Sequence, residues 1–322
     1  MPNELTSTPA IAVVVATRNR ATRLGALLES LRAQTIVVPF EVIVVDDAST
    51  DETGECLAKF AGETRFRFRY VVRDRDAGPA RARNEGWALA EAPLVAFTDD
   101  DCVTDPDWLA ECLRVAVENR GAVVQGVTRP IPTELSRIGP FSHTRDVDGT
   151  GPWFETCNIV YPKELLKQLG GFDESFPEPL GEDTDLGWRA LAAGAQHVAA
   201  PRALVFHAVD DLGLCGHLKL ALRGRDAVLV FKRHPKLRRK ALGGGILRND
   251  AHLRLLISVA GVMLTQRPAL RIVAAYPYAR QLVWRCRSVD ASPVYVPYFI
   301  VFDALSLFTT LRGDMKHRVF VI

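Results

Sequence analysis

Short apolar runs rich in β-branched residues alternate with segments of helical periodicity through the first part of the chain. Such runs, each followed by a helix of about a dozen residues, predict βαβ units on a parallel sheet that is buried on both faces. The alternation therefore predicts an α/β fold of the nucleotide-binding type. The expected strands are 11–15, 40–45, 67–72 and 94–98, and the expected helices are 21–34, 49–60, 79–90 and 106–119.

Polar clusters follow three of these expected strands, at residues 17–20, 46–47 and 99–101. In open α/β sheets, ligands bind in the crevice outside the carboxyl ends of the strands. The sequence therefore predicts that the three clusters converge on one crevice.

Charge is distributed unevenly along the chain. Residues 215–322 contain 19 Lys and Arg but only five Asp, which gives +14, whereas the rest of the chain carries −12 within a total of +2. This asymmetry predicts a division into residues 1–212 and a basic, mainly helical region 213–322.

The six cysteines contain no C-x-x-C pair, so we expect reduced thiols and a cytosolic protein. Glu4 precedes a first apolar run that is too short for a secretory signal.

Asp99, Asp100 and Asp101 are consecutive, and like charges this close repel one another and raise each other's pKa. A hard divalent cation such as Mg²⁺ or Mn²⁺ would compensate them. Alternatively, they form a strand-to-helix loop whose acids cap the next helix. Both explanations remain open from these residues alone.

Nucleotide-binding loops of two common types do not occur in the sequence. No G-x-G-x-x-G follows the first strand, and there is no G-x-x-x-x-G-K-[ST] loop. Arg81 and Arg83 stand near the start of the helix expected at 79–90, where the free backbone N–H groups also favour anions. We therefore expect metal and arginine to neutralise any phosphate-bearing ligand, with a solvated helix face as the alternative.

Taken in order, six segments resemble family 2 of the glycosyltransferases, the inverting enzymes with the GT-A fold. The matching segments span residues 11–207 and lie at 13–20, 40–51, 78–86, 97–101, 170–174 and 181–189. The resemblance implies a GT-A type, mostly parallel sheet flanked by helices, a nucleoside diphosphate sugar as donor, and Mn²⁺ or Mg²⁺ as cofactor.

The resemblance also implies roles for donor-binding residues. Asp47, with Asp46 as its neighbour, matches the acid that pairs with the nucleobase, and Ala16 and Arg18 match the other wall of that pocket. A carboxylate can accept the N3–H of uracil, although Asp47 could equally cap the helix that follows.

The aspartate triplet matches the D-x-D motif of the family. By resemblance, Asp101 binds the metal, Asp99 approaches the ribose or a metal-bound water, and Asp100 between them has the least defined contact with the donor. His207 matches a residue that, in part of the family, supplies a further metal ligand or touches the diphosphate. A histidine that closes an apolar run can also be a packed core residue.

On the acceptor side, the general base of the family matches Asp183, with Glu182 as its nearest rival, at the start of a helix that we expect to end near Ala193. Acids at a helix start are also ordinary partners of the helix dipole. Asn158 falls where the family forms its acceptor side, as a sugar or acceptor contact.

Residues 213–322 lie outside the resemblance. A basic cluster at 232–240 and glycines at 243–245 precede three apolar segments, 253–264, 270–284 and 294–311. Arg271, Arg280, Pro297 and Asp303 interrupt these segments, so we expect surface helices rather than a membrane span. Peripheral attachment to anionic lipid, at the inner face of the membrane, fits this composition, as does a helical subdomain or a homodimer contact. No nucleic-acid recognition motif accompanies the basic charge.

The sequence thus predicts a glycosyltransferase that moves a sugar, most simply from a UDP-linked donor, onto an acceptor hydroxyl of a sugar, a small molecule, or a lipid-linked or cell-surface glycan. A sugar nucleotidyltransferase is the enzymatic alternative, but its Gly-rich, lysine-bearing phosphate loop is absent here. A catalytically inactive carbohydrate- or membrane-binding relative is the other alternative.

Overall fold

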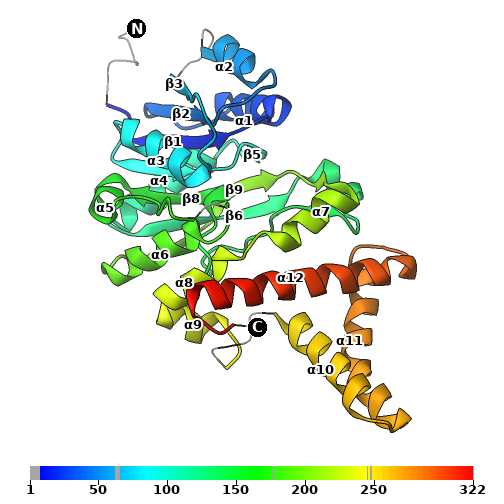
Figure 1. Cartoon of the computed structure of the whole chain (residues 1–322). Helices are drawn as coiled ribbons and strands as arrows, with labels where there is room; N and C mark the ends of the chain where they lie inside the picture. The colour runs from blue at the N-terminus through cyan, green and yellow to red at the C-terminus, as the bar shows by residue number, and fades with distance from the viewer. Residues whose placement is uncertain (1–7, 62–65, 177, 245, 247–248, 322) are drawn as a thin grey trace. The chain divides into compact units, whose positions relative to one another are not determined.

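The structure is a computed structural model that describes residues 8–61, 66–176, 178–244, 246 and 249–321 (Figure 1). Glu4 and Gly245, which enter two of the sequence-based expectations, lie outside these residues. The chain forms two compact units. The first comprises residues 1–133 and 144–208, and the second comprises 134–143 and 209–322. The functional boundary at residue 212 stays a prediction.

The first unit contains an eight-stranded sheet in the order β3-β2-β1-β4-β8-β6-β9-β5. Strands β3, β2, β1 and β4 are parallel to one another, β8 runs antiparallel to β4 and β6, β9 is parallel to β6, and β5 is antiparallel to β9. The strands are β1 Ile11–Thr17, β2 Phe40–Asp46, β3 Arg67–Val72, β4 Leu94–Phe97, β5 Cys102–Thr104, β6 Val123–Pro130, β8 Ile159–Pro162 and β9 His197–His207.

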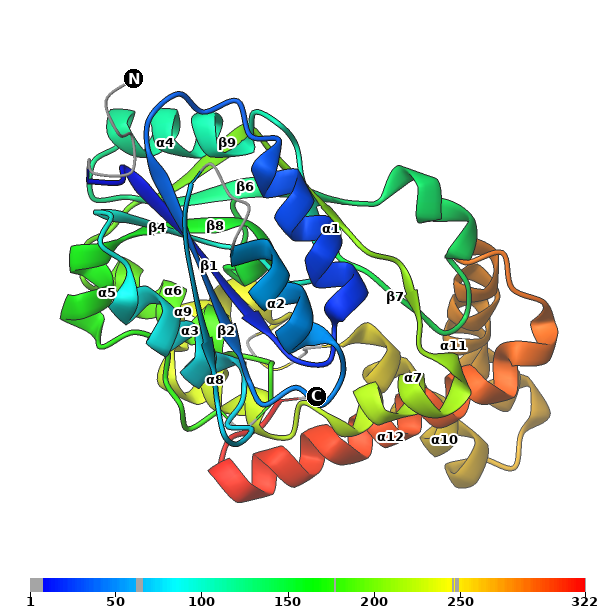
Figure 2. The same ribbon diagram turned by 90° about the horizontal axis from the view of Figure 1, so that it is seen from above.

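Helices cover both faces of this sheet, as the buried β-branched runs predict. Ile11, Val13 and Val15 of β1 share one core cluster with α1, α2 and α4, whereas Val14 contacts Gly86 of α3 on the opposite face. Figure 2 shows α1 and α2 beside β1 and β2. The helices of this unit are α1 Ala21–Arg32, α2 Thr53–Ala61, α3 Pro79–Leu89, α4 Trp108–Glu118, α5 Lys163–Leu169 and α6 Glu182–Ala192, with short 3-10 turns η2 Pro132–Arg137, which continues into the second unit, and η3 Thr156–Asn158.

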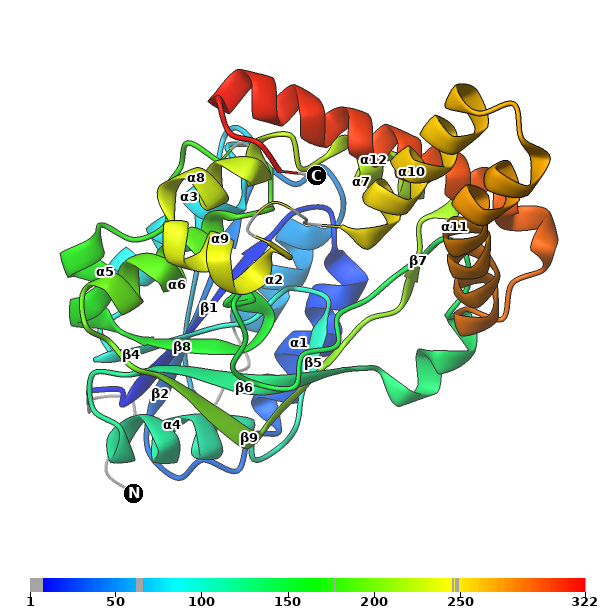
Figure 3. The same ribbon diagram turned by 90° about the horizontal axis from the view of Figure 1, so that it is seen from below.

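The second unit is mainly helical, as predicted. The two-residue strands β7 (Ser142–His143) and β10 (Asp210–Asp211) pair in it, and Figure 3 shows α7 running alongside α12. A small core joins Leu255, Tyr278, Leu282, Phe299 and Leu307. The helices are α7 Gly213–Leu222, α8 Leu229–Arg233, α9 Pro235–Ala241, α10 Asp250–Leu264, α11 Pro268–Ser288 and α12 Val296–His317, with 3-10 turns η4 Asp226–Val228 and η5 Pro293–Tyr295.

Within the described residues, one helical stretch, Pro293–His317, is long and apolar enough to cross a membrane by length and composition alone. The interruptions at Pro297 and Asp303 therefore do not exclude a span on these two criteria. Asp303 is buried in the second unit, where it accepts hydrogen bonds from Tyr278 Oη and Arg285 Nη1, both at 2.9 Å. The six cysteines are all free thiols.

Candidate active site

The carboxyl ends of β1, β2 and β4 meet at one edge of the sheet. β1 lies between the other two strands, and Thr17 at its end is paired in register with Asp46 at the end of β2. β4 ends at Phe97, two residues before Asp99. Because parallel strands end at the same edge, the three polar clusters expected from the sequence lie along it.

Asp47 connects the end of β2 to the start of α3. Its carboxylate accepts hydrogen bonds from the backbone N–H groups of Ala77 (3.1 Å) and Gly78 (2.8 Å), and it pairs with Arg73 Nε at 3.4 Å. Burial raises the pKa of Asp47, and the backbone donors oppose this rise. Neighbouring Asp46 is also buried and accepts from Ser49 N (3.0 Å) and Ser49 Oγ (2.5 Å). Asp46 therefore fixes the turn before α2.

Ala16 and Arg18 lie at the end of β1. Ala16 is half-buried, and Arg18 is exposed and pairs with Asp76 in the loop that follows β3. This loop also contains Ala77, whose N–H binds Asp47. The two walls that the sequence predicts for a base pocket thus converge on the same loop.

The three consecutive aspartates contact different groups. Asp99 pairs with Arg83 Nη2 at 3.0 Å, Asp100 accepts a 2.7 Å hydrogen bond from Thr17 Oγ1, and Asp101 lies 3.7 Å from Arg20 Nη2. Burial, with the charge of Asp101 as the next cause, raises the pKa of Asp100 to about 7. The sequence-based assignments passed over Thr17 and Arg20 as partners of these acids, although both belong to the cluster at 17–20.

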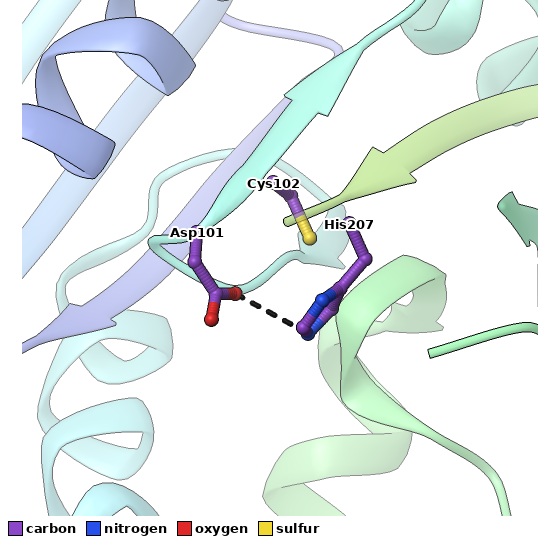
Figure 4. Close-up of side chains that lie close together, drawn as sticks. All are labelled: Asp101, Cys102 and His207. Carbon is purple, nitrogen blue, oxygen red and sulfur yellow. Dashed lines mark ion pairs between the residues drawn. The ribbon is translucent and has the colours of Figure 1, made fainter. Parts of the chain in front are cut away.

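Asp101, Cys102 and His207 form a group of potential metal ligands whose ligand atoms all lie within 4.8 Å of one another (Figure 4). The Asp101 carboxylate lies 3.3 Å from His207 Nε2, because antiparallel pairing of β5 with β9 sets Cys102 opposite His207. Burial raises the pKa of the Cys102 thiol well above its usual value, and hard cations such as Mg²⁺ and Mn²⁺ prefer oxygen donors to sulfur. The remaining donors are a carboxylate oxygen and an imidazole nitrogen.

A divalent metal fits this donor set. Carboxylate oxygens suit Mg²⁺ and Mn²⁺, whereas imidazole nitrogen is a ligand of transition metals rather than of Mg²⁺. His207 Nδ1 lies 2.8 Å from the carbonyl oxygen of Ala208. If Nδ1 carries the proton, this contact orients the ring and leaves Nε2, facing Asp101, as the lone-pair donor.

Arg83 links the aspartate triplet to the start of α6. Its guanidinium is buried and pairs with Asp99 Oδ1 at 3.0 Å and with Glu182 Oε1 at 2.9 Å. Arg81 lies two positions earlier on the same helix, is exposed, and pairs with Glu174 at 2.9 Å. Residues two apart on a helix point in different directions, so the two arginines serve different acids.

Glu182 and Asp183 occupy the first turn of α6. Burial raises the pKa of Glu182 to about 7, with repulsion by Asp183 as the next cause, while Arg83 opposes the rise. Burial also raises the pKa of Asp183, whose Oδ1 accepts a 2.6 Å hydrogen bond from Thr184 N. The two acids differ in their partners, since Glu182 is held by the Arg83 guanidinium whereas Asp183 is held by the backbone N–H of Thr184.

Asn158 has a structural role in this conformation. Its side chain is fully buried, accepts from Trp108 Nε1 at 2.8 Å, and donates to the carbonyls of Val127 and Ala203, both at 2.9 Å. These contacts join η3 to α4, β6 and β9. The Asn158 amide is thus engaged inside the core in this structure, and the expected sugar contact stays a prediction.

Glu155 is an acid of this region that the sequence-based assignments missed. Its Oε2 atom is buried and, among the described residues, has no hydrogen-bond partner. Burial raises its pKa, and the charge of Asp183 adds to the rise. Preceding Phe154 has a positive φ of 58° and stacks on His197 at a centroid distance of 4.1 Å. No sequence motif identifies Phe154 and Glu155 as site residues, because the residues that surround them come from elements distant in the sequence.

A comparison with family models matches residues 12–172, half of the chain, to the model described as glycosyl transferase family 2. The chain belongs to glycosyl transferase family 2. The resemblance that the six motifs carry is therefore confirmed, and so is the α/β fold with a mostly parallel sheet.

Several curated relatives of this family 2 member are glycosyltransferases by name. Validoxylamine A glucosyltransferase of Streptomyces hygroscopicus subsp. jinggangensis is 33% identical over 231 residues, which cover 60% of this chain and 54% of the relative. Pre-mycofactocin glycosyltransferase of Mycobacterium tuberculosis is 29% identical over 250 residues, covering 74% of this chain and 51% of the relative. The chain thus spans about half the length of these curated relatives.

Solved structures with the same fold include proteins in complex with nucleotide sugars. A mannosyltransferase from Pyrobaculum calidifontis, in complex with GDP-Man and Mn²⁺, has a TM-score of 0.62 at 20% sequence identity. The superposition covers 99% of this chain and 89% of the mannosyltransferase chain. S. aureus TarS in complex with UDP-GlcNAc has a TM-score of 0.56 at 18% identity, with coverages of 96% and 91%. These likenesses confirm the GT-A type fold of the family 2 chain.

Proposed function

We propose that this family 2 chain is a metal-dependent, inverting glycosyltransferase that moves a sugar from a nucleoside diphosphate donor, most simply UDP-linked, onto an acceptor hydroxyl. The proposal rests on the two ion pairs of the buried Arg83 side chain. It binds Asp99 of the triplet on one side and Glu182 of α6 on the other, so that two acidic motifs 83 positions apart in sequence share one cation. A donor held at the triplet would therefore lie beside the acids of α6.

Asp101 and His207 would hold a Mn²⁺ or Mg²⁺ ion, with Asp99 as the neighbouring acid. When bound, such an ion stabilises the negative charge that grows on a departing diphosphate. The carboxylate and imidazole pair favours Mn²⁺ over Mg²⁺, and the P. calidifontis structure contains Mn²⁺. Cys102 lies in the same group, but it is not a proposed ligand, because Mg²⁺ and Mn²⁺ prefer oxygen donors to sulfur.

Asp183 is the proposed general base. Inversion in a single displacement requires a group that accepts the proton of the attacking hydroxyl, and burial raises the pKa of Asp183 in the direction that makes it a stronger base. Glu182 is the weaker candidate because its Oε1 is already paired with Arg83. We therefore assign proton acceptance to Asp183 and the holding of Arg83 to Glu182.

The donor's base and diphosphate would contact the edge formed by β1, β2 and α3. Asp47 and Asp46 would define the base pocket, with Ala16 and Arg18 opposite, and Arg18 is exposed enough to stack on a ring. Arg81 and Asp100 are the remaining proposed donor contacts. Asn158 is not part of this proposal, since its amide groups are engaged in the core.

The acceptor is proposed to be a lipid-linked or cell-surface glycan, a sugar or another small molecule, and the protein is proposed to act in the cytoplasm, at the inner face of the membrane. A homodimer is compatible with this proposal. TarS and the other solved neighbours resemble the chain in fold alone. The names of the relatives include a glucosyltransferase, so glucose donors belong in any test panel.

The test is donor binding and slow donor hydrolysis with a panel of UDP- and GDP-linked sugars, with Mn²⁺, with Mg²⁺ and with EDTA. We expect metal-dependent thermal stabilisation and release of nucleoside diphosphate, both lost in Asp101→Asn. Asp183→Asn should keep donor binding but slow donor hydrolysis, because the attacking water would lack the group that accepts its proton. The matched control is Asp107→Asn at the exposed start of α4.

Three results would overturn the proposal. The first is normal donor hydrolysis by Asp101→Asn, and the second is the absence of metal-dependent binding to every donor. The third is formation of a nucleotide sugar and pyrophosphate from a sugar phosphate and a nucleoside triphosphate, which would identify a nucleotidyltransferase.

A further inference from the structure

We propose that the connection between α10 and α11, residues 262–273, inserts into the surface of an anionic lipid bilayer. We call these residues the hairpin tip. This inference goes beyond the proposed glycosyl transfer and does not depend on it, since it concerns a surface of the second unit. Figure 1 shows the tip at the end of the α10–α11 pair that points away from α12.

The tip exposes large apolar side chains on both helices. Leu264 is 86% exposed, Met263 is 73% exposed and Ile272 is 68% exposed. Further exposed apolar residues at the tip and beside it are Val259, Val262, Leu270, Val273 and Tyr276. Isolated exposed apolar residues are common on soluble proteins, but a contiguous group of this kind marks an interaction site.

Small residues pack the two helices of the hairpin, which explains why the large side chains point outward. A Cβ on Gly261 would lie 2.2 Å from the Cβ of Ala274, so the helices are in close contact there. Ser258 Oγ donates to the Ala274 carbonyl at 3.2 Å. Because small groups make the contact between the helices, the leucine, isoleucine and methionine side chains near the tip remain free for another partner.

The backbone of the tip is hydrogen-bonded by groups within the tip. Thr265 Oγ1 accepts from Arg267 N at 3.2 Å, Arg271 Nε donates to the Thr265 carbonyl at 2.8 Å, and Leu270 N donates to the Arg267 carbonyl at 3.1 Å. The free-energy cost of moving a loop from water to the bilayer surface is lower when its polar groups are already hydrogen-bonded in this way.

Charge selects lipid as the occupant of this surface. Residues 251–289 contain no Asp or Glu. Of their six arginines, Arg254 pairs with Asp250 and Arg285 pairs with Asp303. The other four are Arg267, Arg271, Arg280 and Arg287, and the first two of these lie in the tip. A second copy of the chain would bring the same positive charge, which opposes pairing of two tips. An anionic bilayer supplies both the apolar layer for the tip and the negative charge for the arginines around it.

The experiment is flotation of the purified full chain with phosphatidylcholine vesicles, with and without phosphatidylglycerol. The test variant is Leu264→Glu combined with Ile272→Glu. The control is Val37→Glu in the first unit, where the valine is 95% exposed and the same kind of charge is introduced outside the tip. Far-UV circular dichroism checks that each variant is folded, and sedimentation measures self-association without lipid.

We expect the wild type and the Val37→Glu control to float with vesicles that contain phosphatidylglycerol, and to bind pure phosphatidylcholine more weakly. The tip variant should bind at least about tenfold more weakly, because two aliphatic side chains are lost and two carboxylates are introduced. Arg280→Gln, on the exposed side of α11, should reduce binding only to the anionic vesicles.

Equal flotation of the tip variant and the control would overturn the proposal. So would a tip variant that dissociates a wild-type oligomer while the wild type binds no vesicles, because the tip would then be a contact between protein copies. None of these measurements uses a sugar donor, so failure here leaves the proposed enzyme activity untouched, and the reverse also holds.

Discussion

Glu182 should make the folded state less stable as the pH rises from about 4.5 to about 7. Burial and repulsion by Asp183 raise its pKa from 4.5 to about 7. Between these values the unfolded chain has already lost the proton that the folded chain still holds. Because the folded state binds more protons in this window, raising the pH favours unfolding, and the contribution is constant below and above it.

The magnitude follows from the same two values. The gap between 4.5 and about 7 corresponds to a free energy of about 3 kcal/mol. Glu182 is only 3% exposed, so solvent screens little of this effect. Glu182→Gln removes the ionisation but keeps the side-chain volume and an oxygen that can accept from Arg83. The free energy of unfolding of the variant should therefore rise by about 3 kcal/mol relative to that of the wild type as the pH increases from about 4.5 to about 7.

Urea unfolding followed by circular dichroism, at several pH values from 4 to about 8, measures this difference. The two proteins share every other titratable group, so pH effects from distant groups cancel in the comparison, and the measured difference belongs to Glu182 together with Asp183, which repels it. The control is Glu174→Gln, which removes an exposed acid paired with Arg81 in the same unit. If the unfolding free energies of Glu182→Gln and wild type run parallel from pH 4 to about 8, the burial argument for Glu182 is wrong.

Three further predictions concern the same unit. Asp101→Asn should lose the thermal stabilisation that Mn²⁺ gives the wild type, measured by scanning calorimetry with and without EDTA; an unchanged Mn²⁺ effect would contradict this. Gly187→Ala places a Cβ 2.0 Å from Phe154 Cγ, which should lower the free energy of unfolding by about 1–3 kcal/mol in urea titrations; unchanged stability would show that the Phe154 ring moves freely. Arg83→Met leaves Asp99 and Glu182 without their shared cation and should cost about 3–5 kcal/mol near pH 8, and a cost below about 1 kcal/mol would mean that this ion pair is solvated.

The parallel half of the sheet could be predicted closely from the sequence. Strands β1, β2 and β3 begin at the residues expected, because both faces of β1 and β2 are buried and their β-branched runs are continuous. Helix α2 begins at Thr53 rather than at residue 49, since the Asp46 carboxylate accepts from Ser49 and holds a turn there. Local side-chain contacts of this kind shift the ends of elements without changing their order.

The second half of the sheet could not be predicted in the same way. Strand β5 has three residues, and β9 contains Pro201 and a shift of register against β6 between Gly126 and Val127. A three-residue strand is too short to leave a periodic signal, and the proline and the register shift interrupt the pattern of β9, so pairing rather than composition defines both strands. Yet this half places His207 opposite Cys102, next to the triplet.

For the candidate site, the sequence predicts the kinds of side chain but not their pairing. Both Arg81 and Arg83 were candidates for an anion, but the packing of α3 turns Arg83 into the core, toward Asp99 and Glu182, and leaves Arg81 on the surface with Glu174. The rotation of a helix about its axis depends on its whole buried face, here including Gly86 against Val14. No single motif contains that information.

The aspartate triplet posed a choice between a loop that caps the next helix and a metal site. Among the described contacts these acids cap no helix, because the short strand β5 follows them. Asp99 has Arg83, Asp100 has Thr17, and Asp101 has His207 and Arg20 nearby, so each carboxylate has a protein group of its own. Arg83 and Arg20 offset part of the repulsion among the three, and burial and the remaining repulsion raise the pKa of Asp100 to about 7, so the fold can also keep the acids together by holding one proton. It follows that EDTA should remove any Mn²⁺-dependent donor binding while leaving the far-UV circular dichroism spectrum unchanged. Unfolding by EDTA would instead make the cation part of the fold, and the three separate partners would then be too weak to hold the triplet.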